Sequence, residues 1–291
     1  MKDLHLVRNL LLAREGGTIC ALYREGDELV KRTLPVEQVR AIYAEGSEVV
    51  VRQAEHYLDP VKRLALARKF VRGGAVNIMR NLEHYEGSGA QLEGAVEAVR
   101  GALEGVGSAG SVEELMGIEG NMREAYYNGW NSIMPEEFHY SGRTRRPPRT
   151  MLDALISFGN SLAYSTCLTE LYHTQLNPTI SYLHEPSERR FSLALDISEV
   201  FKPVLVDRTI FRLVRQERMD ESYFDEDLNR VLLNERGRRK FVEAYEERLS
   251  STIRGRKGRK ASLRRLVRLE AYKLLKHVVG MGEYEPVEVG Y

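Results

Sequence analysis

The segment from Thr150 to Thr174 is apolar on nearly all sides, and it constrains the fold more strongly than any other feature of the chain. A helix that is apolar all round is stable only when other elements cover every face of it. Thr150 and Asp153 form a capping pair that marks where this helix begins. We therefore expect a central buried helix at 150–174, surrounded by other helices.

The rest of the chain after residue 50 also has a helical pattern. Asp59 and Pro60 predict the start of a helix that continues to Val71. A second helix is expected from about Gly73 to Tyr85, and low-complexity helices rich in Gly, Ala and Glu follow as far as residue 107. This part of the chain is therefore predicted to be one large α-helical domain.

The first 50 residues have a different pattern. Three short runs contain β-branched or aromatic residues and are separated by turn residues: 18–23, 28–33 and 39–43. Runs of this kind predict β-strands. The expected fold class is α+β, with a small N-terminal β-rich domain at 1–50 followed by a larger all-α domain at 51–291.

Glu119 is a carboxylate on the apolar side of a predicted amphipathic helix. Ser111 and Glu114 form a capping box at its start. At about 100° per residue, the apolar side chains fall in one narrow stripe with Glu119 in its middle. The stripe consists of Val112, Leu115, Met122, Tyr126, Trp130 and Ile133. An ionised carboxylate that faces the interior costs several kcal/mol unless a proton, a basic partner or a metal ion compensates its charge.

The helix alone leaves the compensating group open. A buried ion pair with Arg or Lys would be the ordinary structural explanation for Glu119. Gly117 and Gly120 favour the close approach of another group, because a glycine inside a helix costs about 1 kcal/mol relative to alanine and often marks a close contact of the backbone. A group opposite Glu119 is therefore expected, either a basic side chain or a metal ion.

A second acidic cluster lies on another predicted helix. Asp196 and Glu199 are three residues apart and are therefore neighbours on its flank. Two like charges side by side repel each other, and a hard divalent cation such as Mg²⁺ or Mn²⁺ relieves that repulsion through oxygen ligands and an occasional imidazole. His184 precedes Pro186, outside this helix, where it could reach the same point. Each signal is weak alone, since an Asp-x-x-Glu pair on a helix is usually a solvated face.

The composition narrows the class of protein. A chain of 291 residues can hold one large or two ordinary domains. Its two cysteines, Cys20 and Cys167, form neither a disulfide framework nor a zinc motif, so we expect packing roles and a reducing compartment. The apolar run from Leu4 to Ala13 lacks a cleavage site, and no stretch reaches the length of a membrane span. We therefore expect a cytoplasmic protein with no membrane contact.

Positive charge is segregated along the chain, although the formal net charge is only +1. One basic cluster lies in a Pro-rich loop and consists of Arg143, Arg145, Arg146 and Arg149. The other lies between Thr252 and Arg268, contains no acidic residue, and includes Arg254, Arg256, Lys257, Arg259 and Lys260. Both clusters are compatible with a solvated surface or with phosphate binding, and the place of the Pro-rich loop between the two acidic motifs favours contact with a nucleic-acid backbone.

Several motifs in combination resemble a known family. They are Gly-Ile-Glu-Gly-x-x-Arg-x-x-Tyr-Tyr around Glu119, Arg-Arg-Pro-Pro followed by Ala-Leu-Ile-Ser-Phe-Gly-Asn-Ser-Leu-Ala-Tyr, and the stretch from Asn177 to Asp207 with Leu-His-Glu and Leu-Ala-Leu-Asp-Ile-Ser-Glu. With these motifs the chain closely resembles the integrases of CRISPR spacer acquisition, which insert fragments of foreign DNA into the repeat array. The likeness extends from about Gln53 to the C-terminus.

The resemblance implies a metal-dependent DNA integrase and endonuclease whose α-helical domain is catalytic. Carried over by position, the catalytic residues and metal ligands are Glu119, His184 and Glu199, with Asp196 as a supporting acid and Mg²⁺ or Mn²⁺ as the ion. Many members have aspartate where this chain has Glu199, which is a longer but chemically equivalent ligand. In this role His184 must be neutral, because an imidazolium cannot bind a metal.

The resemblance also implies partners. They are DNA, as incoming fragment and as repeat array, a second copy of the chain in a homodimer, and the small ferredoxin-like protein of the same adaptation complex. Arg123, at the edge of the Glu119 stripe, is expected to contact a phosphate near the ion. The two basic clusters are expected to hold the DNA backbone.

The chain departs from the family in its N-terminal domain. Relatives carry several further strands at the position between about Gly46 and Val49, where this chain passes almost directly from the third expected strand into the first helix. The β-rich domain is therefore shortened relative to the family. Since the missing region contributes to the homodimer contact of the family, the resemblance does not define the dimer geometry of this chain.

A different class of function also fits the sequence. The chain could be a catalytically silent, helical nucleic-acid-binding subunit of the same complex, with an acidic cluster that only forms buried salt bridges. Replacement of Glu119 separates the two hypotheses, because an integrase loses strand transfer and keeps DNA binding. A metallophosphatase acting on nucleotides is disfavoured, because the chain lacks a phosphate-binding glycine loop.

Overall fold

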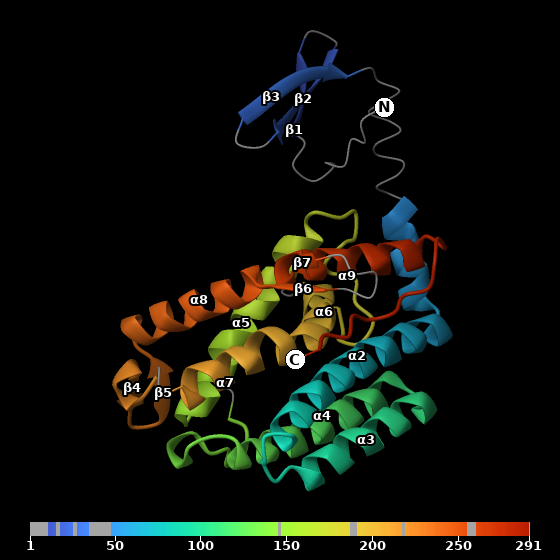
Figure 1. Ribbon diagram of the computed structural model, residues 1–291. Coiled ribbons are helices and arrows are strands. Elements are labelled where there is room, and N and C mark those ends of the chain that lie inside the picture. The colour runs from blue at the N-terminus through green and yellow to red at the C-terminus, as the bar shows by residue number, and fades with distance from the viewer. Residues whose placement is uncertain are drawn as a thin grey trace.

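Helix α5 (Met151–Leu171) runs through the helical part of the molecule and contacts α6 (Ser192–Lys202) and α9 (Leu263–Val278) (Figure 1). The computed structural model describes residues 48–144, 147–186, 191–216, 219–253 and 260–290, together with the backbone alone at 11–15, 18–25, 28–34 and 254. Thr150 caps α5, since its hydroxyl accepts a hydrogen bond from the Asp153 N–H at 3.0 Å. Most of α5 is buried, as predicted for a central helix, but Ser161, Ser165 and Thr169 form an exposed face, so the helix is not covered on every side.

Helix α2 (Pro60–Glu86) is a single helix of 27 residues, and the prediction of two helices divided near residue 72 was wrong. The Asp59 carboxylate caps it as expected, accepting from the N–H groups of Val61 and Lys62. Gly73 does not break α2 but lets the C-terminal segment pack against it. A Cβ on Gly73 would lie 2.6 Å from Cβ of Pro286.

Helices α3 (Glu93–Ser108) and α4 (Val112–Gly129) pack against α2 and against each other (Figure 1). The start of α4 confirms the predicted capping residue, because the Ser111 hydroxyl accepts from the Glu114 N–H at 3.1 Å. The predicted apolar stripe of α4 faces the core. Trp130 at its end is fully buried, and its ring centroid lies 4.6 Å from that of Phe211.

The remaining elements complete the helical part and add two short hairpins. They are η1 (Trp130–Ser132), η2 (Glu136–Phe138), the π-helix η3 (Pro203–Asp207), α7 (Arg208–Arg215), η4 (Glu221–Tyr223), β4 (Phe224–Asp227), β5 (Arg230–Leu233), α8 (Glu235–Ser250), β6 (Thr252–Arg254) and β7 (Lys260–Ser262). Residues 48–58 are also helical. Both hairpins, β4–β5 and β6–β7, are antiparallel, and neither was predicted.

The N-terminal residues include three antiparallel strands in the order β1 (Leu11–Glu15), β2 (Thr18–Glu25) and β3 (Glu28–Leu34). In this register Cys20 on β2 is opposite Ala13 and Thr33. Strands β2 and β3 coincide with two of the predicted strands, whereas β1 was not predicted. The third predicted strand, at 39–43, lies outside the described residues, and a β-rich domain at 1–50 stays a prediction.

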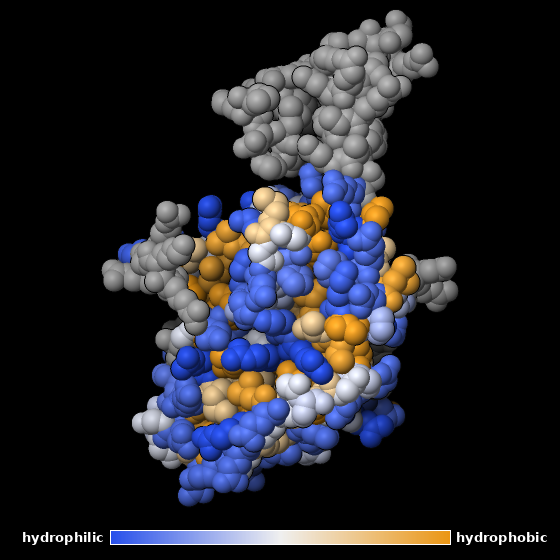
Figure 2. All heavy atoms as spheres, turned by 90° about the vertical axis from the view of Figure 1, so that its right-hand side faces the viewer, coloured by the Kyte–Doolittle hydropathy of each residue, from blue (hydrophilic) through white to orange (hydrophobic). Residues whose placement is uncertain are grey.

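Hydrophilic side chains cover most of the face seen in Figure 2, with apolar side chains exposed in separate areas between them. The most exposed large apolar residues include Leu58 and Val61, each 76% exposed, near the start of α2. Across the part of the chain that the structure describes, no helix combines the length and the apolar character needed to cross a lipid bilayer.

Candidate active site

Glu119 lies on the inner side of α4, as its position in the apolar stripe predicted. Its side chain is 21% exposed, whereas Leu115 and Met122, about one turn away on either side, are buried. The fixed start of α4 at Ser111 sets the helical phase, because each residue turns by a constant angle from there. This phase directs Glu119 toward α6.

Arg123 joins Glu119 to Glu199 across two helices. Arg123 lies one turn after Glu119 on α4, and its Nε donates a hydrogen bond to Oε1 of Glu119. Its Nη2 donates to Oε2 of Glu199 on α6. Lys202, three residues further along α6, donates from Nζ to the other carboxylate oxygen of Glu199. One guanidinium therefore brings the two carboxylates together, and Glu199 has a cation on each oxygen.

Asp196 holds the loop that carries His184. Its fully buried carboxylate accepts hydrogen bonds from the backbone N–H groups of Tyr182, Leu183 and His184 at 2.7, 3.1 and 3.0 Å. His184 Nδ1 lies 2.8 Å from Oδ1 of Asp196. Because an ionised carboxylate can only accept, the proton is assigned to Nδ1. The other ring nitrogen, Nε2, lies 4.0 Å from Oε1 of Glu199.

The charges around Glu199 shift two pKa values. Burial disfavours the charged form of Glu199, but Lys202, Arg123 and His184 outweigh burial and hold the pKa of Glu199 below its ordinary value. Burial also lowers the pKa of His184, whereas the hydrogen bond and charge of Asp196 and the charge of Glu199 raise it, and the net shift is upward. This arrangement therefore favours a protonated His184, which is a further positive charge beside Glu199.

A buried acid, Asp207, lies near Arg123. It is 1% exposed at the end of the π-helix η3, between α6 and α7. Burial raises the pKa of Asp207 to about 7, against the charge of Arg123 and a hydrogen bond with Tyr126, which lower it. Among the described residues, Oδ2 of Asp207 has no hydrogen-bond partner. π-Helical turns are frequent at functional sites.

Asn81 on α2 connects the elements around this acid. Its Nδ2 donates to the Tyr126 hydroxyl on α4 at 2.9 Å and to the carbonyl of Pro203 on η3 at 3.0 Å. Its Oδ1 accepts from Nε of Arg208 on α7 at 2.7 Å. All these groups are buried, so the hydrogen bonds fix the π-helix against α2 and α4.

A separate cluster fixes the chain just after His184. Glu185 accepts from Nη2 of Arg63 at 2.5 Å and from the Tyr57 hydroxyl at 3.1 Å. Nε of Arg63 donates to the carbonyl of Tyr182 at 3.0 Å. The His184 loop is therefore held from α6 by Asp196 and from α2 by Arg63, so that the ring has a defined position.

The expected cluster of three mutually facing metal ligands is not present as such. Within the described ranges, the His, Cys, Asp and Glu side chains include no group of three or more that could hold a metal ion. The physical reason is that the Arg123 guanidinium lies between the carboxylates of Glu119 and Glu199 and takes the place of a compensating cation. The sequence left open whether a basic side chain or a metal ion compensates these carboxylates. Arg123 and a metal ion would therefore compete to balance the charges of Glu119 and Glu199.

The chemistry of the donor set nevertheless fits a hard divalent cation. Two carboxylates and an imidazole nitrogen are ligands that Mg²⁺ and Mn²⁺ accept. Nε2 of His184 is the nitrogen on the side of Glu199, while Nδ1 is bound to Asp196 behind it. A carboxylate behind a histidine is the arrangement that orients histidine ligands in metal sites. Asp196 itself uses both oxygens in hydrogen bonds, which suits a supporting acid better than a ligand.

The residues predicted to bind DNA lie in different environments. Arg143 is directed into the protein: Nη1 contacts Asp153 Oδ1 at 2.8 Å, Nη2 contacts Ser157 at 3.0 Å, and the side chain is only 14% exposed. Arg143 therefore anchors the loop to α5 instead of offering an open surface to phosphate. Arg149 and Lys260 are exposed. Arg123, also predicted to contact a phosphate, is 11% exposed and is bound to Glu119 and Glu199. The other predicted contacts lie outside the described side chains: Arg145, Arg146, Arg254, Arg256, Lys257 and Arg259.

The sequence did not lead us to two cations near the site, Lys202 and Arg63, or to the buried acid Asp207. Lys202 follows Glu199 by three residues on one helix, so the helical period alone could have identified it as a partner. Arg63 and Asp207 could not have been found in this way, because their positions near the site depend on the packing of α2 and η3. Asp207 was part of the quoted motif, but no role was assigned to it.

Comparisons with known proteins agree with the resemblance. Residues 12–247 match the model of a family described as CRISPR associated protein Cas1. A CRISPR-associated endonuclease Cas1 from Moorella thermoacetica is 51% identical over 242 residues, which is 83% of this chain and 73% of that protein. The solved structure of a Cas1 protein from Thermotoga maritima is 41% identical, with a TM-score of 0.72 over 80% of this chain and 73% of that one.

More distant structures share the fold. A casposase bound to its integration product has a TM-score of 0.75 at 16% identity, over 96% of this chain and 95% of that one. A chain of a Cas6-RT-Cas1–Cas2 complex has a TM-score of 0.74 at 16% identity, over 96% of this chain and 35% of that one. At this identity the likeness concerns the fold alone.

Proposed function

The chain belongs to the CRISPR-associated Cas1 family, and from that premise we propose that it is a DNA integrase and endonuclease of CRISPR adaptation. It would insert foreign DNA fragments into the repeat array. The observation that supports this most directly is that Arg123 bonds both Glu119 and Glu199, while Nε2 of His184 lies 4.0 Å from Glu199 and Asp196 lies behind the imidazole. The related chains named endonuclease Cas1 support the same class of reaction.

The reaction exchanges one phosphodiester bond for another. The 3′-hydroxyl oxygen of the incoming fragment forms a bond to the scissile phosphorus in line with the 3′-oxygen that leaves. No side-chain nucleophile is needed. Glu119, Glu199 and Nε2 of His184 would hold a Mg²⁺ or Mn²⁺ ion. When bound, the ion acts as a Lewis acid on the scissile phosphate and stabilises charge on the leaving oxygen.

The residues around the ligands have distinct parts in this proposal. Asp196 holds one proton on Nδ1 of His184, and an ion would bind Nε2 only by displacing the second proton, which the surrounding carboxylates favour in the absence of metal. Arg123 and Lys202 place two positive charges beside Glu199, where a phosphate would arrive. Such fixed charges attract the substrate and stabilise charge that develops on phosphate oxygens.

The partners follow from the geometry of integration. Insertion of a fragment requires two strand transfers at separated sites, and hence two active sites in one assembly. We propose a homodimer of this chain together with a small ferredoxin-like partner. Two structural neighbours, one from a Cas6-RT-Cas1–Cas2 complex and the other a casposase bound to its integration product, are consistent with a protein partner and with DNA.

The substitution Glu119→Ala tests the proposal. Strand transfer of a labelled fragment into a repeat-containing plasmid should fall at least about 100-fold, because one of the carboxylate ligands is lost. DNA affinity should stay within about twofold, since Glu119 makes no favourable contact with phosphate. The control is Glu113→Ala, an exposed residue in the first turn of the same helix, which should join DNA normally. Unchanged joining by Glu119→Ala would contradict the assigned role.

One observation favours the second candidate function, a catalytically silent nucleic-acid-binding subunit. Glu119 and Glu199 are both compensated by Arg123 and Lys202, which is what a purely structural cluster would look like. The two candidates differ in their response to Mn²⁺. A silent subunit should show no rise in melting temperature that depends on Glu119, Glu199 and His184, whereas the integrase should.

A further inference from the structure

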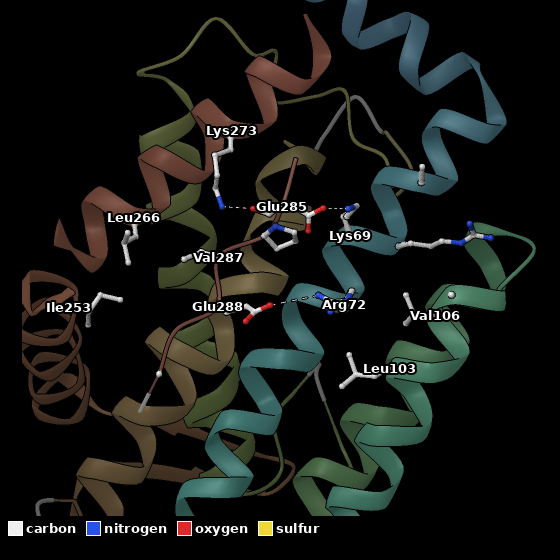
Figure 3. Close-up of a pocket in the computed structure, with 15 residues that line it drawn as sticks. Lys69, Arg72, Leu103, Val106, Ile253, Leu266, Lys273, Glu285, Val287 and Glu288 are labelled. Atoms are coloured by element: carbon white, nitrogen blue, oxygen red, sulfur yellow. Dashed lines mark hydrogen bonds and ion pairs between the residues drawn. The ribbon is translucent and has the colours of Figure 1, made fainter. Parts of the chain in front are cut away.

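A groove of about 1320 Å³ lies apart from the candidate active site, and none of its lining residues belongs to that site (Figure 3). One wall comes from α2 and α3, and the other comes from α9 and from Ile253 on β6. Four basic side chains line it: Arg68, Lys69 and Arg72 on α2, and Lys273 on α9. Three of these four cations therefore lie within little more than one turn of a single helix.

The C-terminal segment 280–290 crosses this groove. Gly280, with φ of +76°, turns the chain back from the end of α9, and the Met281 N–H donates to the carbonyl of Lys276 at 2.7 Å. The left-handed conformation at Gly280 is one that residues with a side chain rarely adopt. From there the chain passes between α9 and α2 with Glu285 and Glu288 in the groove (Figure 3).

The backbone and the apolar side chains anchor this segment. The Val289 N–H donates to Asn77 Oδ1 at 2.8 Å, and Asn77 Nδ2 donates to the Val287 carbonyl at 3.1 Å. The hydroxyl of Tyr284 donates to Glu270 at 2.8 Å. Tyr284 is 1% exposed and Val289 is fully buried. These contacts hold the segment in place independently of the side chains of Glu285 and Glu288.

The two glutamates lie over the cations of α2. Glu285 forms an ion pair with Lys69, and Glu288 lies 3.7 Å from Nη1 of Arg72. The side chain of Lys69 is 35% exposed and that of Glu285 is 60% exposed. The side chain of Arg72 is 52% exposed and that of Glu288 is 33% exposed. Exposed pairs of this kind contribute about 0 to 1 kcal/mol to stability. Their contribution to folding is therefore small, whereas their effect on the charge of the groove is large.

We propose that the groove is a second binding site for the phosphate backbone of DNA, and that Glu285 and Glu288 occupy it as carboxylate substitutes for phosphate. The proposal rests on the proposed function in that the ligand is DNA. The glutamates weaken binding in this groove, because each phosphate must displace a carboxylate from Lys69 or Arg72 before it can pair with the cation. Nonspecific DNA is thereby held away from α2 unless the duplex is also bound elsewhere on the protein.

The double substitution Glu285→Gln/Glu288→Gln tests the proposal by fluorescence anisotropy with a labelled DNA duplex over a range of salt concentrations. Freeing two cations should tighten binding roughly tenfold at low salt and steepen the slope of log K against log salt by about 1.8, which is two further phosphate contacts. Adding Lys69→Gln/Arg72→Gln to the same protein should remove this gain. In the wild-type background Lys69→Gln/Arg72→Gln should have a smaller effect, since its cations are already paired.

The matched control is Glu283→Gln/Glu243→Gln. It removes the same amount of charge from exposed positions, one in the same segment and one on α8, and neither lines the groove. An equal gain in the control, or no gain in Glu285→Gln/Glu288→Gln, would overturn the proposal. Strand transfer distinguishes this outcome from failure of the proposed function: a wild-type protein that binds DNA but does not join it contradicts only the proposed function.

Discussion

At the scale of single residues, Arg123 is the group on which the state of the candidate site depends. It is ion-paired with both Glu119 and Glu199 through a side chain that is only 11% exposed, and Lys202 supplies the second positive charge. Removing one partner from such a buried group leaves the other charges uncompensated, and this costs several kcal/mol. A metal ion at the same carboxylates would restore the balance, so the arginine and the ion compete.

The substitution Arg123→Gln should therefore lower the free energy of unfolding by about 3 kcal/mol without added metal. Saturating Mn²⁺ should stabilise the variant more than the wild type, because the ion relieves a repulsion that Arg123 otherwise suppresses. Urea unfolding with and without MnCl₂ measures both effects. Arg149→Gln, an exposed arginine, is the control and should change stability by less than about 0.5 kcal/mol. Equal stabilisation of wild type and variant by Mn²⁺ would count against competition.

Asp207 makes stability depend on pH. Its folded pKa, about 7, lies above the ordinary value of 3.8, so between these values the folded state keeps a proton that the unfolded state has lost. The stability that this proton contributes is fully present below about pH 4 and is lost as the pH rises through 7. Asp207→Asn removes the titration, because an amide resembles the protonated acid.

Urea unfolding at pH 5 and pH 8 measures this effect. Relative to the Asp207→Asn variant, the wild type should lose on the order of 2 kcal/mol between the two values. In the control Asp225→Asn, at an exposed site on β4, the free energy of unfolding should change with pH as it does in the wild type. If the free energy of unfolding of Asp207→Asn changed with pH by the same amount as that of the wild type, Asp207 would have an ordinary pKa, contrary to this prediction.

At the scale of elements, the glycines of α2 show how the framework of the site is packed. A Cβ on Gly74 would lie 3.0 Å from the carbonyl oxygen of Glu199, and one on Gly73 would lie 2.6 Å from Pro286. Helix α2 can therefore approach α6 and the C-terminal segment closely only without side chains at these positions. The sequence suggested a helix break here, because glycine lowers helix propensity, but tertiary packing prevails over that preference.

The substitution Gly73→Ala should destabilise the protein by about 1 to 3 kcal/mol, since Pro286 must move to admit the methyl group. Gly101→Ala is the matched control. It lies in α3, where nothing lies within 4 Å of an added Cβ, and alanine should stabilise it by up to about 1 kcal/mol. Thermal unfolding of the two variants compares the effects. A stabilising Gly73→Ala would mean that the C-terminal segment is not packed against α2 as described.

Local patterns predicted much of the helical part. The caps at Thr150 and Ser111 and the place of Glu119 in an apolar stripe follow from helical periodicity, which acts over a few residues. The contact of Arg123 with Glu199 could not be predicted in this way, because it depends on how two helices far apart in the chain pack. The hairpins β4–β5 and β6–β7 were missed because their strands are only three or four residues long.

At the scale of the whole molecule, the helices bring residues from α4, α6 and the loop before α6 to one place, while the acidic C-terminal segment packs against α2 beside α6, where Asn77 contacts both. The family match and the fold identify the class of protein. The function proposed for it depends on the positions of three side chains around one ion. Stability measured without a metal ion does not distinguish this arrangement from a structural salt-bridge cluster.

A crystal of the protein grown with Mn²⁺, examined for anomalous scattering, tests that arrangement most directly. We predict one strong peak within about 2.0 to 2.6 Å of Glu119, Glu199 and Nε2 of His184, with Arg123 turned away from at least one carboxylate. Arg123 still bridging Glu119 and Glu199, with no anomalous peak between them at a saturating Mn²⁺ concentration, would contradict the proposed metal site.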